Sequence, residues 1–185
     1  EDIPLVEESA GDCRSPYAES KFQSEKDLLS LMSKEIQVHI LRFFNVYGPG
    51  QDANSNYAAV IPSFIQRITS GQSPTIFGDG SQSRDFIAVS DVVNLITQIL
   101  LKQNNPQNGV YNVATQTETS INELLRIITT SISEIDNTIE IPEIRYEEKR
   151  LGDITSSCAD ISKVVNSFDW SPKIGLAQGI KSLVE

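Results

Sequence analysis

Two hydrophobic patterns alternate along the 185-residue chain, one with helical spacing and one typical of short strands. Apolar residues three or four positions apart predict helices over 15–33, 60–69, 90–102, 121–133 and 160–168, and a short helix near the C-terminal end. Runs rich in β-branched and aromatic residues predict strands over 36–44, 75–77, 83–89, 110–114 and 139–146. Helices and strands therefore alternate, which is typical of an α/β fold.

The first predicted helix has clear start signals. Ser15 suits the N-cap position, and Pro16 suits the first helical position because its missing N–H needs no partner there. The apolar side chains of this helix recur at spacings that predict one buried face: Ala18, Phe22, Leu29 and Met32. Later in the chain, Ser90 or Asp91 is predicted to cap one helix, and Ser120 another, with Glu123 in its first turn.

The strand predicted over 36–44 is typical of a strand covered on both sides, and it runs into a predicted turn at 45–50. Ligands of open α/β sheets gather at the loops that follow the carboxyl ends of strands, so this turn is a candidate binding position. Gly78-Asp79-Gly80-Ser81 is predicted to be a tight turn only, because its glycines lack the spacing of a phosphate-binding loop. No G-x-G-x-x-G follows a strand in the sequence, so the phosphate half of any dinucleotide site is expected outside this chain.

Composition and charge restrict the possible partners. With 39% hydrophobic and 22% charged residues, and no apolar run near the ~18 residues of a membrane helix, we expect a soluble globular protein. The net charge of -10 argues against nucleic acid as a partner. An acidic protein that handles an anionic small molecule must concentrate a few arginines in one place, which draws attention to Arg84 and Arg150. The sequence shows no signal peptide and does not begin with methionine, so we expect it to begin partway through a gene product.

Cys13 and Cys158 belong to no Cys/His pattern, which favours reduced thiols, a cytoplasmic location and the absence of a zinc site. The single histidine, His39, falls within a predicted strand and is interpreted as an ordinary strand side chain.

Tyr17 and Lys21 lie four positions apart, close to the start of the first predicted helix. Residues with this spacing share one helical face. A phenol with a pKa near 10 is a poor base at neutral pH, and bringing such a value near neutrality takes about 4 kcal/mol of charge stabilisation. A neighbouring ammonium supplies part of it, so the pair is a candidate acid/base catalyst. The same two residues also suit an ordinary solvated helix face.

Several ordered motifs follow this pair: Leu-Arg-Phe-Phe-Asn-Val-Tyr-Gly-Pro-Gly-Gln at 41–51, Tyr-Ala-Ala-Val-Ile-Pro at 57–62, Phe-Gly-Asp-Gly-Ser-Gln-Ser-Arg-Asp-Phe at 77–86, Arg-Leu-Gly-Asp at 150–153, Ala-Asp-Ile-Ser-Lys at 159–163 and Trp-Ser-Pro at 170–172. With these motifs, which span essentially the whole chain, the sequence resembles the extended short-chain dehydrogenase/reductase family and is most similar to the nucleotide-sugar 4-epimerases. The polar segment 51–57 most resembles the UDP-glucose and UDP-N-acetylglucosamine epimerases.

The resemblance implies roles for individual residues. Tyr17 would exchange a proton with the sugar 4-hydroxyl, and Lys21 would bind the nicotinamide ribose of an NAD cofactor and stabilise the phenolate. Phe43 and Phe44 would border the nicotinamide. The remaining residues would bind a UDP-sugar: Asn45, Arg84 and Arg150 at the diphosphate, Asp153 at the uridine ribose, and Ala59, Val60, Phe64, Thr75, Ile76, Phe77 and Ile121 around the uracil and ribose.

These residues also have a structural interpretation. The apolar residues Phe43, Phe44, Val60 and Phe64 suit a plain core, and Asn45 suits a turn. Arg84 beside Asp85, or Arg150 near Asp153, suits a surface ion pair.

The implied fold is α/β, with the carboxyl-terminal part of a Rossmann-type parallel sheet and a small α/β nucleotide-sugar-binding domain. Residues 1–47 would end the NAD-binding domain, and 48–185 would form mainly the substrate domain, with about 84–114 partly returning to the Rossmann sheet. The family's glycine-rich loop and catalytic Ser/Thr are missing from the sequence, so this chain alone is expected to be inactive. The resemblance also implies a homodimer formed through the helix that carries Tyr17.

The implied activity is C4 epimerisation of a UDP-hexose or UDP-N-acetylhexosamine through a 4-keto sugar. Two alternatives stay open. One is a nucleotide-sugar 4,6-dehydratase or decarboxylase of the same family, and the other is a binding module for UDP-sugars without redox chemistry.

Overall fold

Helices and strands follow one another in the computed structural model, which describes residues 3–11, 13, 15–33, 35–53, 59–101, 107–150 and 152–185. The helices are η1 (Glu7–Ser9, a 3-10 turn), α1 (Pro16–Ser30), α2 (Val60–Thr69), α3 (Val89–Leu101), α4 (Ile121–Ile135), α5 (Ser162–Phe168) and α6 (Leu176–Val184). The strands are β1 (His39–Phe43), β2 (Asn45–Tyr47), β3 (Thr75–Phe77), β4 (Ser83–Ala88), β5 (Gly109–Val113), β6 (Glu118–Ser120) and β7 (Arg145–Glu147). None of the helices within these described ranges is long and apolar enough to cross a membrane.

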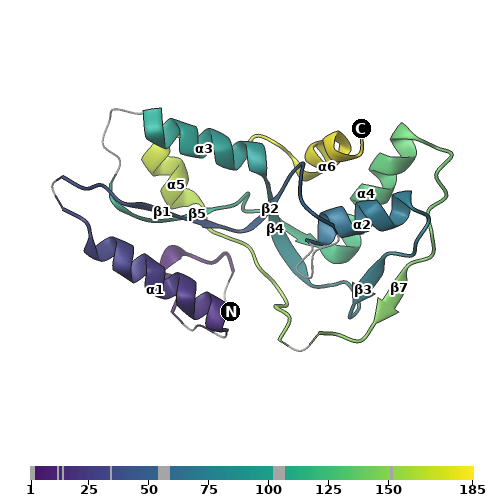
Figure 1. The fold of residues 1–185 in the computed structure, drawn as a ribbon, viewed down its shortest axis with the longest axis horizontal. Helices are drawn as coiled ribbons and strands as arrows, with labels where there is room; N and C mark the ends of the chain where they lie inside the picture. The colour runs from purple at the N-terminus through teal and green to yellow at the C-terminus, as the bar shows by residue number, and fades with distance from the viewer. Residues whose placement is uncertain are drawn as a thin grey trace.

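Most of the strand pairs are parallel, as the alternating pattern predicts. β1 pairs with β5, which places Arg42 opposite Asn112, and β2 pairs with β4, which places Asn45 opposite Phe86. β3 and β7 form another parallel pair, whereas β6 lies antiparallel to β4. Figure 1 shows α1 beside β1 and β5, with α2, α4, β3 and β7 toward the opposite end of the molecule. The α/β class is confirmed.

Strand β4 separates two hydrophobic cores. Phe86 and Ala88 point into the core built mainly from α2, α4 and α6, whereas Ile87 between them points into the core built from α3, α5 and β5. Successive side chains of a strand point to opposite faces, so this short strand contributes to both cores at once. Figure 1 shows β4 between the two groups of elements.

The predicted helix starts at Ser15 and Ser120 are confirmed. The Ser15 hydroxyl accepts a hydrogen bond from the Ala18 amide at 3.1 Å, and the Ser120 hydroxyl accepts one from the Glu123 amide at 3.1 Å. The prediction of Ser90 or Asp91 as a cap is wrong, because α3 already begins at Val89, directly after β4, so both residues lie within the helix. The buried Asp91 carboxylate instead accepts from the backbone amides of Lys173 and Ile174 at 3.1 and 3.0 Å, and so holds the segment before α6.

The first helix and strand differ from their predictions. α1 ends at Ser30, and its predicted buried face is only half-buried at Ala18, Phe22 and Leu29, whereas Met32 lies beyond the helix and is exposed. β1 begins at His39 and its side chains are half-buried or exposed, so the expectation of a strand covered on both sides is wrong for the described residues. Its β-branched and aromatic content is equally compatible with a partly covered strand.

Three short strands explain the other differences. Asn45–Tyr47 was predicted to be a turn, but it forms β2 because it pairs with β4, and the turn begins only at Gly48. β6 was not predicted. The strand predicted over 139–146 is reduced to β7, which is exposed at every position. Lys102, Leu151 and residues 54–58, which were assigned to a predicted helix end and to sequence motifs, lie outside the described residues.

Candidate functional site

A cavity of about 240 Å³ opens between α2, β3, β4 and the loop near residue 150. Its lining residues are Asn45, Val60, Phe64, Thr75, Ile76, Phe77, Gln82, Arg84, Ile121, Arg150 and Asp153. All of them except Gln82 are predicted substrate contacts, and they come from segments spread over more than half of the chain. Of the predicted substrate contacts, only Ala59, the residue before α2, is absent from this lining. The fold thus brings the predicted residues together in one concave place, as binding sites require.

Arg84 is held in the wall of this cavity by three acceptors. Its Nη2 donates to the Asp153 carboxylate at 2.6 Å, and its Nη1 donates to the carbonyls of Ser83 and Ile154, both at 2.7 Å. The Arg84 and Asp153 side chains are both mostly buried, so this charge-assisted contact is less screened than one on the open surface.

The interpretation of Arg84 and Asp85 as a surface ion pair is wrong, because the two side chains point to opposite faces of β4. Asp85 is fully buried, and its carboxylate accepts from the amide and hydroxyl of Thr115 at 2.8 and 2.7 Å and from the Ala159 amide at 3.3 Å. Arg84 lies on the same face as Phe86, toward the core that borders the cavity.

Arg150 provides a second guanidinium at the same cavity. Its guanidinium carbon lies 3.8 Å from the centroid of the Phe77 ring, a cation–π arrangement, whereas Asp153 pairs with Arg84. Arg150 itself is exposed. Two arginines at one cavity, in a chain of net charge -10, concentrate positive charge where an anion can bind.

The apolar wall of the cavity is also part of a hydrophobic core. Phe64, Ile76 and Ile121 are buried members of the core around α2 and α4, and Val60 packs against it. Val60 and Phe64 therefore pack in the core, as their structural interpretation predicts, and they also line the cavity. Such a wall is rigid, since core side chains are closely packed.

Gln82 is the lining residue that the sequence reasoning missed. Its side-chain amide donates to the Phe77 carbonyl at 2.7 Å, and its backbone carbonyl accepts from the backbone amide of Ile121 at 3.0 Å. It therefore joins the end of β3 to the start of α4 across the cavity. Its place within the motif at 77–86, two positions before Arg84, was the available signal.

Tyr17 and Lys21 are neighbours on α1, as predicted. The Lys21 Nζ lies 5.5 Å from the centroid of the Tyr17 ring, and the tyrosine is 72% exposed. Phe43 at the end of β1 is also exposed, whereas the next residue, Phe44, packs partly against the core around β5. Tyr17 and Phe43 are therefore open to a ligand.

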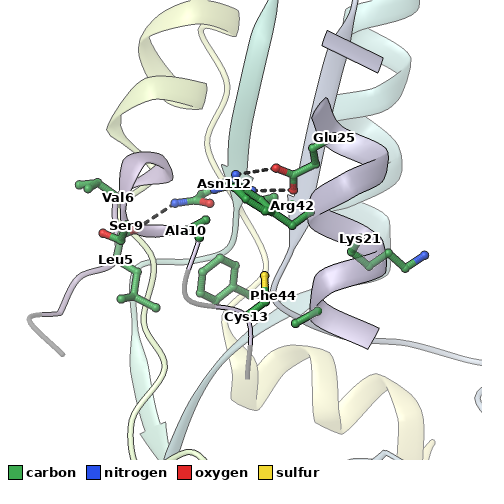
Figure 2. A pocket seen from close by; sticks show the side chains of 13 residues that line it. Leu5, Val6, Ser9, Ala10, Cys13, Lys21, Glu25, Arg42, Phe44 and Asn112 are labelled. Atoms are coloured by element: carbon green, nitrogen blue, oxygen red, sulfur yellow. Dashed lines mark hydrogen bonds and ion pairs between the residues drawn. The ribbon is translucent and has the colours of Figure 1, made fainter. Parts of the chain in front are cut away.

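A second cavity, of about 630 Å³, lies beside α1 (Figure 2). Its lining residues are Leu5, Val6, Ser9, Ala10, Gly11, Cys13, Ala18, Lys21, Phe22, Glu25, Arg42, Phe44 and Asn112. Figure 2 shows Glu25 projecting from α1 toward Arg42, while the ammonium of Lys21 points away from that pair. Lys21 and Phe44 are the residues that this cavity shares with the predicted cofactor contacts.

The donors on α1 fit one end of a dinucleotide. The Tyr17 hydroxyl and the Lys21 ammonium can donate to ribose hydroxyls, and the exposed Phe43 ring offers an apolar face. Within the described ranges, no group of three or more His, Cys, Asp or Glu is placed to hold a metal ion.

The histidine and the cysteines do not line the cavity of about 240 Å³. His39 is a strand side chain, as predicted, and its ring meets Phe168 edge to face at 5.8 Å. Burial lowers the pKa of His39. Cys13 and Cys158 are both free thiols.

Comparison with known proteins agrees with this arrangement. Residues 1–114 match the NAD dependent epimerase/dehydratase family. The chain is 32% identical to the UDP-glucose 4-epimerase of Mycolicibacterium smegmatis over 98% of its length and 56% of the relative's, and 31% identical to the human dTDP-D-glucose 4,6-dehydratase over 92% and 47%. Among solved structures it resembles the UDP-N-acetylglucosamine 4-epimerase of Methanobrevibacter ruminantium M1, in complex with UDP-N-acetylmuramic acid, with a TM-score of 0.88, 38% identity and coverage of 99% of this chain and 56% of that one.

The chain thus spans about half the length of the relatives it matches. The motifs, the parallel strand pairs and the family match over residues 1–114 all lead to one assignment. This chain belongs to the NAD-dependent epimerase/dehydratase family.

Proposed function

We propose that the whole protein inverts C4 of a UDP-hexose or UDP-N-acetylhexosamine through a 4-keto sugar. The observation that carries this proposal is the cavity of about 240 Å³, where two arginines, Asp153 and Asn45 meet an apolar wall. The same chain displays an exposed Tyr17 beside Lys21. One relative is a UDP-glucose 4-epimerase and another is a UDP-N-acetylglucosamine 4-epimerase. Together they support a UDP-sugar as the substrate class, but they do not identify the sugar.

In this proposal, the cavity holds the nucleotide. Arg84 and Arg150 bind the diphosphate, because guanidinium groups form charge-assisted, directional hydrogen bonds with phosphate oxygens. Asn45 adds a side-chain contact to the diphosphate, and Asp153 accepts from the ribose hydroxyls. The uracil and ribose lie against the apolar wall, whose members are Val60, Phe64, Thr75, Ile76, Phe77 and Ile121, with Ala59 beside it.

Tyr17 and Lys21 act at the sugar. The Tyr17 phenolate takes the proton of the 4-hydroxyl and later returns it, while the Lys21 ammonium stabilises the phenolate and binds a ribose hydroxyl of the cofactor. Bound NAD supplies a hydride acceptor and donor at C4. Phe43 and Phe44 border the nicotinamide. Residues outside this chain supply the remainder of the cofactor site.

A second candidate is a 4,6-dehydratase of the same family, which the similarity to the human dTDP-D-glucose 4,6-dehydratase supports. The two reactions share the oxidation at C4, so the same Tyr17 and Lys21 serve both. Product analysis separates them, because an epimerase returns a UDP-hexose of the same mass, whereas a dehydratase releases a 4-keto-6-deoxy sugar that has lost water.

We also propose how the whole protein is organised. Residues 1–47 end its NAD-binding domain, 48–185 form mainly the substrate domain, and about 84–114 return in part to the first domain. Exposed apolar side chains at the end of α1, namely Leu28, Leu31 and Met32, support a homodimer through this helix. The free thiols of Cys13 and Cys158 support a cytoplasmic location.

The deciding experiment replaces Tyr17 by Phe in the full-length protein. Turnover of UDP-glucose and UDP-N-acetylglucosamine should fall by about a thousandfold or more, while the affinity for UDP, measured by calorimetry, should stay within about twofold. Tyr146→Phe is the matched control, because Tyr146 is another exposed tyrosine and lies outside both cavities. Unchanged turnover in Tyr17→Phe would remove the proposed mechanism.

The 185-residue chain alone provides an independent test. We expect it to bind UDP, because the nucleotide cavity lies within it, and to show no turnover, because part of the cofactor site lies outside it. Turnover by the chain alone would contradict this expectation, and absence of UDP binding would contradict the assigned cavity.

A further inference from the structure

Helix α1 packs loosely against the other described residues of this chain. None of its side chains is fully buried, and the cavity of about 630 Å³ lies between it, β1, residues 5–11 and Cys13. Its apolar contacts come from the half-buried Ala18, Phe22 and Leu29. Few interlocked side chains leave a helix free to shift or rotate, so a directional polar contact has a large share in setting its position.

Glu25 makes such a contact. Arg42 of β1 donates from Nε to one Glu25 carboxylate oxygen at 2.8 Å and from Nη2 to the other at 2.6 Å, as Figure 2 shows. The two side chains are only 20% and 15% exposed. A two-point guanidinium–carboxylate contact defines both distance and orientation, which a single ion pair does not.

Arg42 makes a further contact, to Glu7, which is itself anchored to β5. Its Nη1 donates to the backbone carbonyl of Glu7 at 2.7 Å, and the buried Glu7 carboxylate accepts from the backbone amide of Asn112 at 2.7 Å. Asn112 is the residue opposite Arg42 in the β1–β5 pair, and its side chain donates to the Leu5 carbonyl at 2.9 Å. Arg42, which is part of β1, therefore contacts η1 directly and β5 through Glu7 and Asn112, and it connects these elements to α1.

We infer that Arg42 is a positioning residue. Through Glu25, it fixes the position of α1, and so of Tyr17 and Lys21, relative to the β1–β5 pair; this inference rests on the proposed function. Glu25 lies four positions after Lys21 and eight after Tyr17, so all three belong to the same short helix, α1. Along the helix axis, Glu25 lies about 12 Å from Tyr17, and a rigid helix carries any displacement over that length. A shift of about 1 Å at a reacting group is enough to cost a large factor in rate.

The test is Glu25→Gln in the full-length protein, with Arg42→Lys as a second variant that keeps the charge but loses the two-point contact. We expect kcat to fall by about tenfold or more in Glu25→Gln, and less in Arg42→Lys, with KM and UDP affinity within about twofold in both. Amide exchange of α1 should become about tenfold faster while that of α4 stays unchanged. Glu123→Gln is the matched control, because it breaks a two-point contact with Arg126 on the exposed side of α4, and it should leave all these values unchanged.

The outcomes are distinguishable. Unchanged α1 exchange, unchanged kcat, or a proportional loss of kcat and UDP affinity would each overturn the positioning role. Faster α1 exchange in Glu25→Gln, together with full turnover in Tyr17→Phe, would contradict the proposed function and also the catalytic consequence of the pair. If the wild type turns over neither UDP-sugar, the exchange measurement still decides whether the pair holds α1.

Discussion

The Arg84 guanidinium and the Asp153 carboxylate lie 2.6 Å apart and join segments separated by 69 positions in the chain. The contact lies in the wall of the cavity of about 240 Å³, and the Ser83 and Ile154 carbonyls accept from the same guanidinium. A guanidinium that is already ordered loses less conformational entropy when it binds an anion. The pair therefore both orients the arginine and balances its charge when no ligand is present.

Arg84→Lys should weaken UDP binding by about tenfold or more, because an ammonium cannot donate in one plane to Asp153, two carbonyls and a phosphate. Calorimetric titration with UDP measures the effect. Arg126→Lys is the control, since Arg126 is exposed on α4 and should leave the affinity unchanged. Equal affinities in the two variants would contradict the assignment of Arg84 to the diphosphate.

Gly179 of α6 packs so closely against Tyr47 that there is no space for a side chain. A Cβ at this position would lie 2.1 Å from the Tyr47 hydroxyl oxygen and 2.8 Å from its Cζ, far closer than atoms can approach. Gly179→Ala should lower the free energy of unfolding by about 1–3 kcal/mol, measured by urea denaturation. Gly175→Ala, at the N-cap of the same helix and with no atom within 4 Å, should cost about 1 kcal/mol or less. Equal losses in the two variants would show that α6 moves away freely.

Alkaline pH should destabilise the fold through Tyr47. Burial, and secondly the negative charge of Asp91, raise the pKa of Tyr47 from 10.0 to about 12. The unfolded chain therefore loses this proton first, so the stability that the neutral phenol contributes is complete below pH 10 and is lost as pH rises through about 12.

Tyr47→Phe should remove this part of the loss, which amounts to about 2 kcal/mol. At neutral pH the substitution should change stability by about 1 kcal/mol or less, because the buried hydroxyl has no hydrogen-bond partner among the described residues. Urea denaturation at pH 7 and at several values above pH 10 gives both numbers. Parallel pH curves for wild type and variant would exclude Tyr47 as the cause.

Cys158 should be almost unreactive in the native protein. Burial, then the charges of Asp85 and Glu118 and a hydrogen bond to Asp85, raise the pKa of its thiol from 9.0 to about 11. Because the thiolate is the reactive form, alkylation by iodoacetamide at pH 8 should be about a hundredfold slower than in urea-unfolded protein. Mass spectrometry of the labelled peptide measures the rate, and equal rates in both states would contradict the burial of this thiol.

The sequence predicted best what depends on neighbouring residues. Ser15 and Ser120 were recognised as caps because a cap bonds to an amide three positions away. Asp91 carries an equally good cap signal, but its partners are the amides of Lys173 and Ile174, 82 and 83 positions later. No local pattern contains that information. β2 was missed for the same reason, since Asn45–Tyr47 is a strand only because β4 lies beside it.

The residues that line the cavity of about 240 Å³ were assigned to one site from family motifs rather than from spacing. Arg84, Arg150 and Asp153 carry no local signal that they meet, and the motif order alone placed them together. The motif order did not show which carboxylate pairs with Arg84, which is Asp153 rather than the adjacent Asp85. Gln82 was overlooked because its contacts to Phe77 and Ile121 form only when β3 and α4 are both in place.

The alternation of side chains along β4 links the cavity of about 240 Å³ to the stability of the fold. Arg84 and Asp85 are adjacent, yet one faces the cavity and the other anchors Thr115 and Ala159 in the interior. A single-residue insertion in this strand would exchange them, placing a guanidinium in the core and removing the arginine from the cavity. An insertion here would therefore disrupt the cavity and the core together, so we expect β4 to tolerate no change in length.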